Sequence, residues 1–332
     1  MLKVEDLIAP LSPENPCGED LSYDHALQEL ETMIQGKLET QYSEAEEPNW
    51  REIRERCLEL FGRTKDLHVA IDLTLAWVHE QGFSGLASGL RLVRALLEQY
   101  WEPLYPRLDS ETGNDPLERM NLLSAFVAPE GTFGDPMQFL RRVRRAPLCH
   151  SQRLGTFSLY QAQVSTGKAE APADGNVPDS GTIDAAFRDS DPGYLAQVSD
   201  AINVSIEELN GIADFLDRTV GVTKTFSFDP LKAVLLEARK HLRQYISTAG
   251  PEDAMEQQQA NAATSTAAAP GTIQSRSDVV RSLEAICTYY ERSEPSSPVL
   301  PLLRRTQQLV GKNFNEILQE LAPETVAHVK LT

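Results

Sequence analysis

Apolar side chains recur at helical spacing between residues 49 and 100, and they predict three consecutive helices. The first begins at residue 49, with apolar residues at steps of three and four (Trp50, Ile53, Cys57, Leu60 and Phe61). Residues 67–78 are almost wholly apolar, which predicts a helix buried on most sides. After Gly82 the helical period restarts over residues 83–100, where Gly85 and Gly89 would let a neighbouring helix approach closely. The short connections predict antiparallel neighbours.

The pattern after residue 100 is weaker but still mostly helical. We expect short helices at 117–127 and 136–145, a small β-hairpin near 148–164, and an exposed loop at 165–181. The helical pattern resumes at residue 182, and two long amphipathic stretches, 192–220 and 230–246, predict an αα-hairpin. The predicted fold class is therefore all-α for the most part, with one minor β-hairpin.

Composition divides the chain into four parts. We predict an antiparallel helical N-terminal domain at 1–165, a helical middle domain at 182–248, a flexible linker at 249–275 and a small helical C-terminal domain at 276–332. The linker consists mainly of Ala, Gln, Thr and Ser, so it has too little apolar surface to offset the entropy of ordering. The segments on either side should move independently.

The C-terminal domain is too small to be comfortably stable alone, yet apolar positions occur on each of its helices. We therefore expect it to oligomerise, so that copies of the chain bury this surface against one another. The predicted oligomerisation residues are Val279, Val280, Leu283, Ile286, Tyr290, Leu302, Leu303, Leu309, Phe314, Ile317 and Leu318.

Charge and composition exclude several classes of function. The formal net charge of the 332 residues is −18, and residues 1–140 hold 26 acidic against 11 basic side chains. This excess argues against sequence-independent binding of nucleic acid or of an anionic membrane. No apolar run approaches the roughly 18 residues of a membrane-spanning helix, and the four widely spaced cysteines fit a reducing compartment. We expect a soluble cytoplasmic protein that needs no cofactor.

Two groups of residues invite a catalytic or metal-binding interpretation, and neither supports it well. Cys17 lies near His25, but nothing in the pattern orients the pair, and neighbouring acids would raise the pKa of the thiol. His68, Asp72 and His79 share a helical face, but the rise of about 1.5 Å per residue puts the histidines roughly 16 Å apart. We predict no metal site and interpret these three residues as the polar stripe of a buried helix.

The only dense run of cations is an arginine cluster, which we define as Arg141, Arg142, Arg144 and Arg145. In the last turn of a helix, arginines complement the helix dipole and find internal acidic partners. Arginine is also favoured at protein interfaces, so the cluster is a candidate docking site for a partner.

The N-terminal region resembles the ImpA-type N-terminal domain of the TssA family, which belongs to bacterial type VI secretion systems. The segments that carry this resemblance are 16–24, 47–53, 64–67, 85–90 and 113–116, the last followed by Arg119 and Asn121. Segments 183–188, 277–283, 294–298 and 309–311 are similar to the shorter, baseplate-associated class of that family. The order and spacing of these segments are specific, although no single segment is.

The resemblance implies a mostly α-helical, non-enzymatic scaffold whose C-terminal domain assembles into a ring. It also implies cytoplasmic partners, namely the baseplate, tube and sheath proteins of the contractile apparatus. Two alternatives remain open at this point: a monomeric helical adaptor, and a hydrolase that uses Cys17 or His68.

Overall fold

The computed structural model describes residues 4–36, 47–109, 111, 113–132, 135–171, 179–221 and 225–246, together with Cys287 and Arg304. The chain divides into two compact units, Met1–Ser247 and Thr248–Thr332. Almost all of the described residues belong to the first unit.

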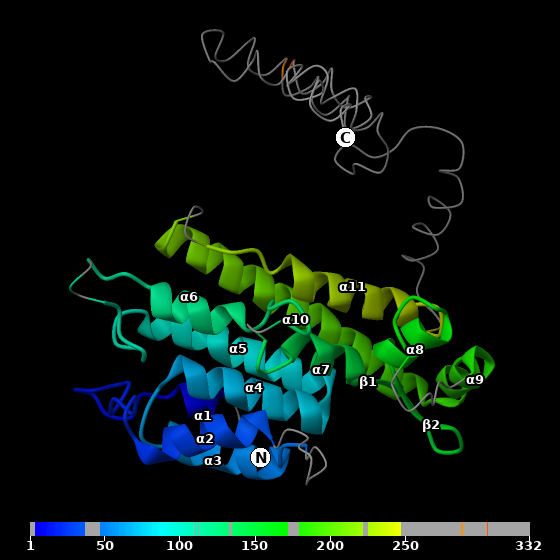
Figure 1. The fold of residues 1–332 in the computed structure, drawn as a ribbon, viewed down its shortest axis with the longest axis horizontal. Helices are drawn as coiled ribbons and strands as arrows, with labels where there is room; N and C mark the ends of the chain where they lie inside the picture. The colour runs from blue at the N-terminus through cyan, green and yellow to red at the C-terminus, as the bar shows by residue number, and fades with distance from the viewer. Residues whose placement is uncertain are drawn as a thin grey trace, which may run out of the picture. The chain divides into compact units, whose positions relative to one another are not determined.

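Helices make up most of this first unit, and Figure 1 shows the long ones lying side by side. The helices are α1 (Val4–Ile8), α2 (His25–Gln35), α3 (Trp50–Phe61), α4 (Leu67–Gln81), α5 (Phe83–Tyr100), α6 (Leu117–Ser124), α7 (Phe139–Arg145), α8 (Leu159–Ser165), α9 (Ser180–Asp189), α10 (Pro192–Thr219) and α11 (Asp229–Leu242). Neighbours pack in the order α2, α3, α4, α5, α10 and α11. The predicted, mostly α-helical fold class is confirmed.

Helices α4 and α5 form the centre of the unit and approach each other closely. A Cβ atom at Gly85 would lie 2.0 Å from the carbonyl oxygen of Trp77, and one at Gly89 would lie 2.3 Å from Cγ2 of Thr74. Real Cβ atoms do not approach other atoms to such distances, so these two positions require glycine. The predicted role of the two glycines in helix packing is confirmed.

The predicted β-hairpin is present, but it is shorter than the sequence indicates. Strands β1 (Pro147–Ser151) and β2 (Gly155–Ser158) pair antiparallel. Residues 159–164 were expected in the hairpin and instead form α8, so that part of the prediction is wrong. Ser158 caps this helix: its hydroxyl accepts from the N–H of Gln161, whose side chain in turn accepts from the N–H of Ser158.

The segment before residue 49 contains two helices that the apolar pattern did not lead us to predict. Helix α2 begins after Asp24, whose carboxylate accepts from the N–H of Ala26, and it buries Leu27, Leu30 and Ile34. This helix covers one side of α3. It also forms a wall of a cavity.

Helices α5 and α10 pack against each other and join the regions that we predicted as separate N-terminal and middle domains. Apolar side chains of both regions belong to one hydrophobic core. On the surface beside it, Glu208 of α10 accepts from Arg91 at 3.3 Å and from Arg94 at 3.2 Å. Separate folding of 1–165 and 182–248 stays a prediction, and the shared core shows that the two regions pack as one unit. Among the described helices, none is both long and apolar enough to cross a membrane.

Candidate functional site

Three sequence segments meet at one edge of the helical unit, two of them segments that carry the family resemblance. The N–H of Lys65 donates to the carbonyl of Cys17 at 2.8 Å, and the N–H of Tyr105 donates to the carbonyl of Lys65 at 3.1 Å. Gly18 has a φ of +72°, and a Cβ there would lie 2.1 Å from the carbonyl oxygen of Arg63. These motif residues therefore hold loops together rather than present reactive groups.

The thiol of Cys17 is fully buried within this junction. Burial raises its pKa, while the nearby cations Lys65, Arg107 and Arg119 act in the opposite direction. The sequence led us to expect a raised pKa because of adjacent acids; the direction is right and the cause is wrong. His25 begins α2 on the surface, where it pairs with Glu29 at 3.3 Å. A buried, protonated thiol is a poor nucleophile.

Arg119 is a fully buried cation that fastens α6 to the turn after α5. Its Nε donates to the carbonyl of Pro106 at 2.8 Å, one terminal nitrogen donates to that of Leu104 at 2.6 Å, and the other donates to that of Trp101. Its guanidinium also lies over the Trp101 ring at 4.8 Å. Burial lowers the pKa of Arg119 to about 10, which still leaves it charged at neutral pH. The guanidinium thus replaces its lost hydration with three carbonyls and an aromatic face.

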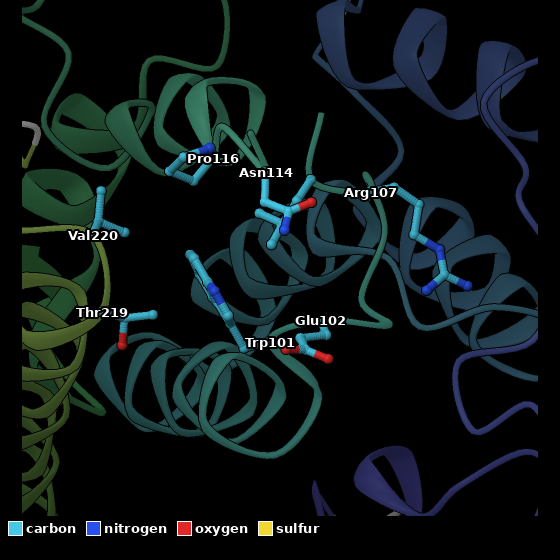
Figure 2. Close-up of a pocket in the computed structure, with 8 residues that line it drawn as sticks. Trp101, Glu102, Arg107, Asn114, Pro116, Thr219 and Val220 are labelled. Atoms are coloured by element: carbon cyan, nitrogen blue, oxygen red, sulfur yellow. The ribbon is translucent and has the colours of Figure 1, made fainter. Parts of the chain in front are cut away.

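Trp101, over which this guanidinium lies, also lines a surface pocket of about 490 Å³, which Figure 2 shows in close-up. The Trp101 ring lies between Thr219 and Val220, at the end of α10, and the loop that carries Asn114 and Pro116. The next residue in the chain is Leu117, whose large apolar side chain is 61% exposed. A tryptophan beside exposed apolar surface is typical of protein-binding sites. We did not identify this pocket from the sequence, because its walls come from segments more than 100 residues apart.

The polar residues of α4 lie in two different surroundings. His68 lies between Glu31, at 3.4 Å, and Asp72, at 3.8 Å, and Asp72 itself is fully buried. His79 instead stacks on the ring of Trp50, with the ring centroids 5.1 Å apart. Within the described part of the chain, no group of three His, Cys, Asp or Glu side chains is placed to hold a metal ion.

Each member of the arginine cluster has a partner inside the same unit. The contacts are Arg141 with the Gln138 side chain at 2.8 Å, Arg142 with Glu47 at 3.4 Å and over the Trp50 ring at 4.5 Å, Arg144 with Glu130 at 3.0 Å, and Arg145 over the Tyr160 ring at 4.7 Å. Internal pairing was one of the two interpretations drawn from the sequence. A role of the cluster in docking a partner stays a prediction.

The predicted oligomerisation residues, from Val279 to Leu318, lie outside the described residues. The set remains an expectation drawn from the sequence pattern.

Comparison with known proteins identifies relatives for the whole chain. Residues 8–128 match the family model described as ImpA, N-terminal, type VI secretion system. The chain is 37% identical over 343 aligned residues to the type VI secretion system component TssA1 of Pseudomonas aeruginosa, and the alignment covers 98% of this chain and 97% of that protein. Among solved structures, it matches the N-terminal domain, including the conserved ImpA_N region, of the TssA component of the Burkholderia cenocepacia type VI secretion system. The match has a TM-score of 0.59 at 19% sequence identity, and it covers 74% of this chain and 93% of the other. This similarity supports a shared fold.

Proposed function

Since the chain belongs to the TssA family of type VI secretion system components, we propose that it is a non-enzymatic scaffold that assembles into a ring through residues 276–332. In this proposal, the ring works in the cytoplasm and engages baseplate, tube and sheath proteins while the contractile apparatus is assembled. The helical unit described above then serves as the arm that meets those proteins.

The observation that carries the proposal is the extent of the similarity. The aligned region includes nearly the full length of both this chain and its TssA1 relative, so the C-terminal segment is shared as well as the N-terminal one. A scaffold that binds several proteins needs a rigid unit with binding surfaces and a means of self-association. The helical unit supplies the first, and the apolar pattern of 276–332 favours the second.

The buried thiols support the non-enzymatic part of the proposal. Cys17, Cys57 and Cys149 are all fully buried, and burial raises the pKa of each thiol. A nucleophilic cysteine requires the opposite: an accessible thiol with a lowered pKa. This argues against the hydrolase alternative that uses Cys17.

Self-association is tested by the mass of the full chain in solution. Light scattering should give a mass several times 36.9 kDa for the unaltered protein, and deletion of residues 276–332 should reduce it to that of a single chain. A strict monomer at micromolar concentration would overturn the ring and favour the monomeric adaptor.

Point substitutions locate the proposed interface more sharply. Leu283→Glu and Ile286→Glu place a charge on the apolar stripe, and an unpaired charge in an apolar contact costs several kcal/mol at each interface. We expect both variants to fall to small species while circular dichroism keeps most of its helical signal. Thr288→Glu, on the opposite face by helical spacing, is the matched control and should assemble normally. If both stripe variants stay assembled, the interface lies elsewhere.

A further inference from the structure

A second cavity lies between α2, α4 and α6. It lies beside the N-terminal half of α4, whereas His79, which stacks on Trp50, lies near the C-terminal end of that helix. Its volume is about 280 Å³, close to the lower limit of roughly 300 Å³ for small-molecule sites, so a single side chain suits it better than a cofactor. The ionisable side chains that line it are Glu31, His68 and Asp72, and no lysine or arginine of the described segments lines it. The cavity is thus acidic at one end.

Asp72 is the unusual residue of this cavity. Its side chain has no exposed surface, and neither carboxylate oxygen has a hydrogen-bond partner among the described residues. Buried polar atoms are nearly always hydrogen-bonded, because an unpaired one has lost the hydrogen bonds that water gives it in the unfolded chain. This carboxylate therefore lines the cavity with the imidazole of His68 beside it but without a hydrogen-bond donor among the described residues.

His68 lies between this carboxylate and the surface. Its Nε2 is 3.8 Å from Oδ2 of Asp72 and its Nδ1 is 3.4 Å from Oε1 of Glu31, both longer than a normal hydrogen bond. The side chains of His68 and Glu31 are 26% and 48% exposed, so they mark the mouth of the cavity. The two carboxylates therefore share one imidazole at distances longer than a hydrogen bond, and the acceptor capacity of the buried Asp72 is left unused.

We propose that this acidic cavity binds an arginine side chain presented by a partner protein. A guanidinium offers five donors in a planar fork. This suits a buried carboxylate that has no donor, Asp72, with the partly exposed carboxylate of Glu31 at the mouth. Its aliphatic stem would pack against the apolar wall formed by Ile34, Ile71 and Leu122. The excess of 26 acids over 11 bases in residues 1–140 favours a cationic partner as well. The inference rests on the proposed function in so far as a scaffold must bind other proteins.

The ionisation of Asp72 should make the binding of a guanidinium depend on pH. Burial raises the pKa of Asp72 to about 7; His68 lowers it, whereas Asp66 and Glu31 raise it further. Cys57 of α3 also faces this carboxylate, which together with burial raises the pKa of that thiol. A bound guanidinium favours the ionised form of Asp72, so binding releases a proton. The affinity should therefore rise by about tenfold from pH 6 to pH 8.

The direct test uses capped tripeptides as probes on the full chain. Binding of Ala-Arg-Ala is measured by calorimetry and by saturation-transfer NMR, with Ala-citrulline-Ala as the uncharged isostere and Ala-Lys-Ala as the alternative cation. Asp72→Asn and Glu31→Gln each remove one carboxylate charge. Glu29→Gln removes the same charge from α2 outside the cavity and is the matched control. Circular dichroism and light scattering confirm that each variant is folded and assembled like the unaltered chain.

We expect the arginine peptide to bind the unaltered chain and the Glu29→Gln variant alike, and to lose at least tenfold in affinity with either Asp72→Asn or Glu31→Gln. The citrulline peptide should not bind. Absence of arginine-peptide binding, or equal binding by all variants, overturns the proposal; equal affinity for the lysine peptide overturns its restriction to arginine. If Asp72→Asn does not fold, Glu31→Gln and the pH dependence still decide. None of these results depends on ring formation, so the scaffold proposal and this one can fail separately.

Discussion

Replacement of Arg119 by methionine should destabilise the helical unit more than replacement of any surface arginine. The change keeps a long side chain but removes the donors to the carbonyls of Trp101, Leu104 and Pro106. All of these contacts are made by a side chain with no exposed surface, so water cannot take the place of the lost donors without opening the turn.

The magnitude follows from opposing contributions. Each carbonyl left without a donor costs about 1–3 kcal/mol, and removal of the buried cation recovers several kcal/mol of desolvation. The three carbonyls together cost about 3–9 kcal/mol, so after the recovered desolvation we expect a loss of about 3 kcal/mol in the free energy of unfolding. This is a large part of the roughly 5–15 kcal/mol that stabilises a typical domain. Arg119→Lys keeps the charge but loses the planar fork of donors. Its free energy of unfolding should lie between those of the unaltered chain and of Arg119→Met.

Urea unfolding of the full chain, followed by circular dichroism, measures this loss. The matched control is Arg141→Met, which removes an exposed arginine of α7 whose side chain donates to Gln138. It should change the free energy of unfolding by less than about 0.5 kcal/mol. If Arg119→Met unfolds at the same urea concentration as Arg141→Met, the three carbonyl contacts do not stabilise the unit and the reasoning is refuted.

Three further predictions concern packing, pH and domain organisation. Gly85→Ala should cost about 2 kcal/mol or more in urea unfolding, because its Cβ would overlap the α4 backbone, whereas Ser84→Ala on the exposed side of α5 should be nearly neutral. The pKa of Asp72, raised to about 7, means that the folded chain keeps a proton that the unfolded chain releases near pH 4, so stability falls as the pH rises between these values. The fall amounts to about 4 kcal/mol over the whole range, of which about 3 kcal/mol lies between pH 5 and pH 8. Asp72→Asn should abolish this difference when unfolding is compared at pH 5 and pH 8. Limited proteolysis should cut first between Ala249 and Gln274; cutting first within the helical unit would contradict the domain map.

The parts of the fold that could be predicted are those with a long apolar period. Helices α3, α4, α5, α10 and α11 each repeat apolar residues over three turns or more, and the structure places them where the sequence indicates. Helix α1 has five residues, too few for a period to emerge. Helix α2 does have apolar residues at helical spacing, Leu27, Leu30 and Ile34, and Asp24 caps it. The repeat is short, however, and it follows a proline-rich loop. Helix α8 was mistaken for strand because its apolar residues follow a strand directly.

Side-chain partners were much harder to predict than helices. Within the arginine cluster, successive positions on a helix point about 100° apart, so neighbours in the sequence meet different surroundings. Arg142 consequently packs on Trp50, which precedes the cluster in the sequence. Arg145 packs on Tyr160, which follows it. The spacing of His68 and His79 did predict that they act separately, because the axial rise of a helix is fixed.

Arg119 and Asp72 show what the structure adds to the sequence. Both are charged residues on helices that also carry apolar residues, and the sequence does not indicate the partners of either side chain. In the fold, each becomes fully buried, yet Arg119 donates to three carbonyls and Asp72 has no donor. A buried charge that the fold satisfies is explained by the stability of the fold, whereas one left unsatisfied beside a cavity needs a partner from outside. This contrast assigns Arg119 to the rigid unit and makes Asp72 the residue from which to search for a binding partner.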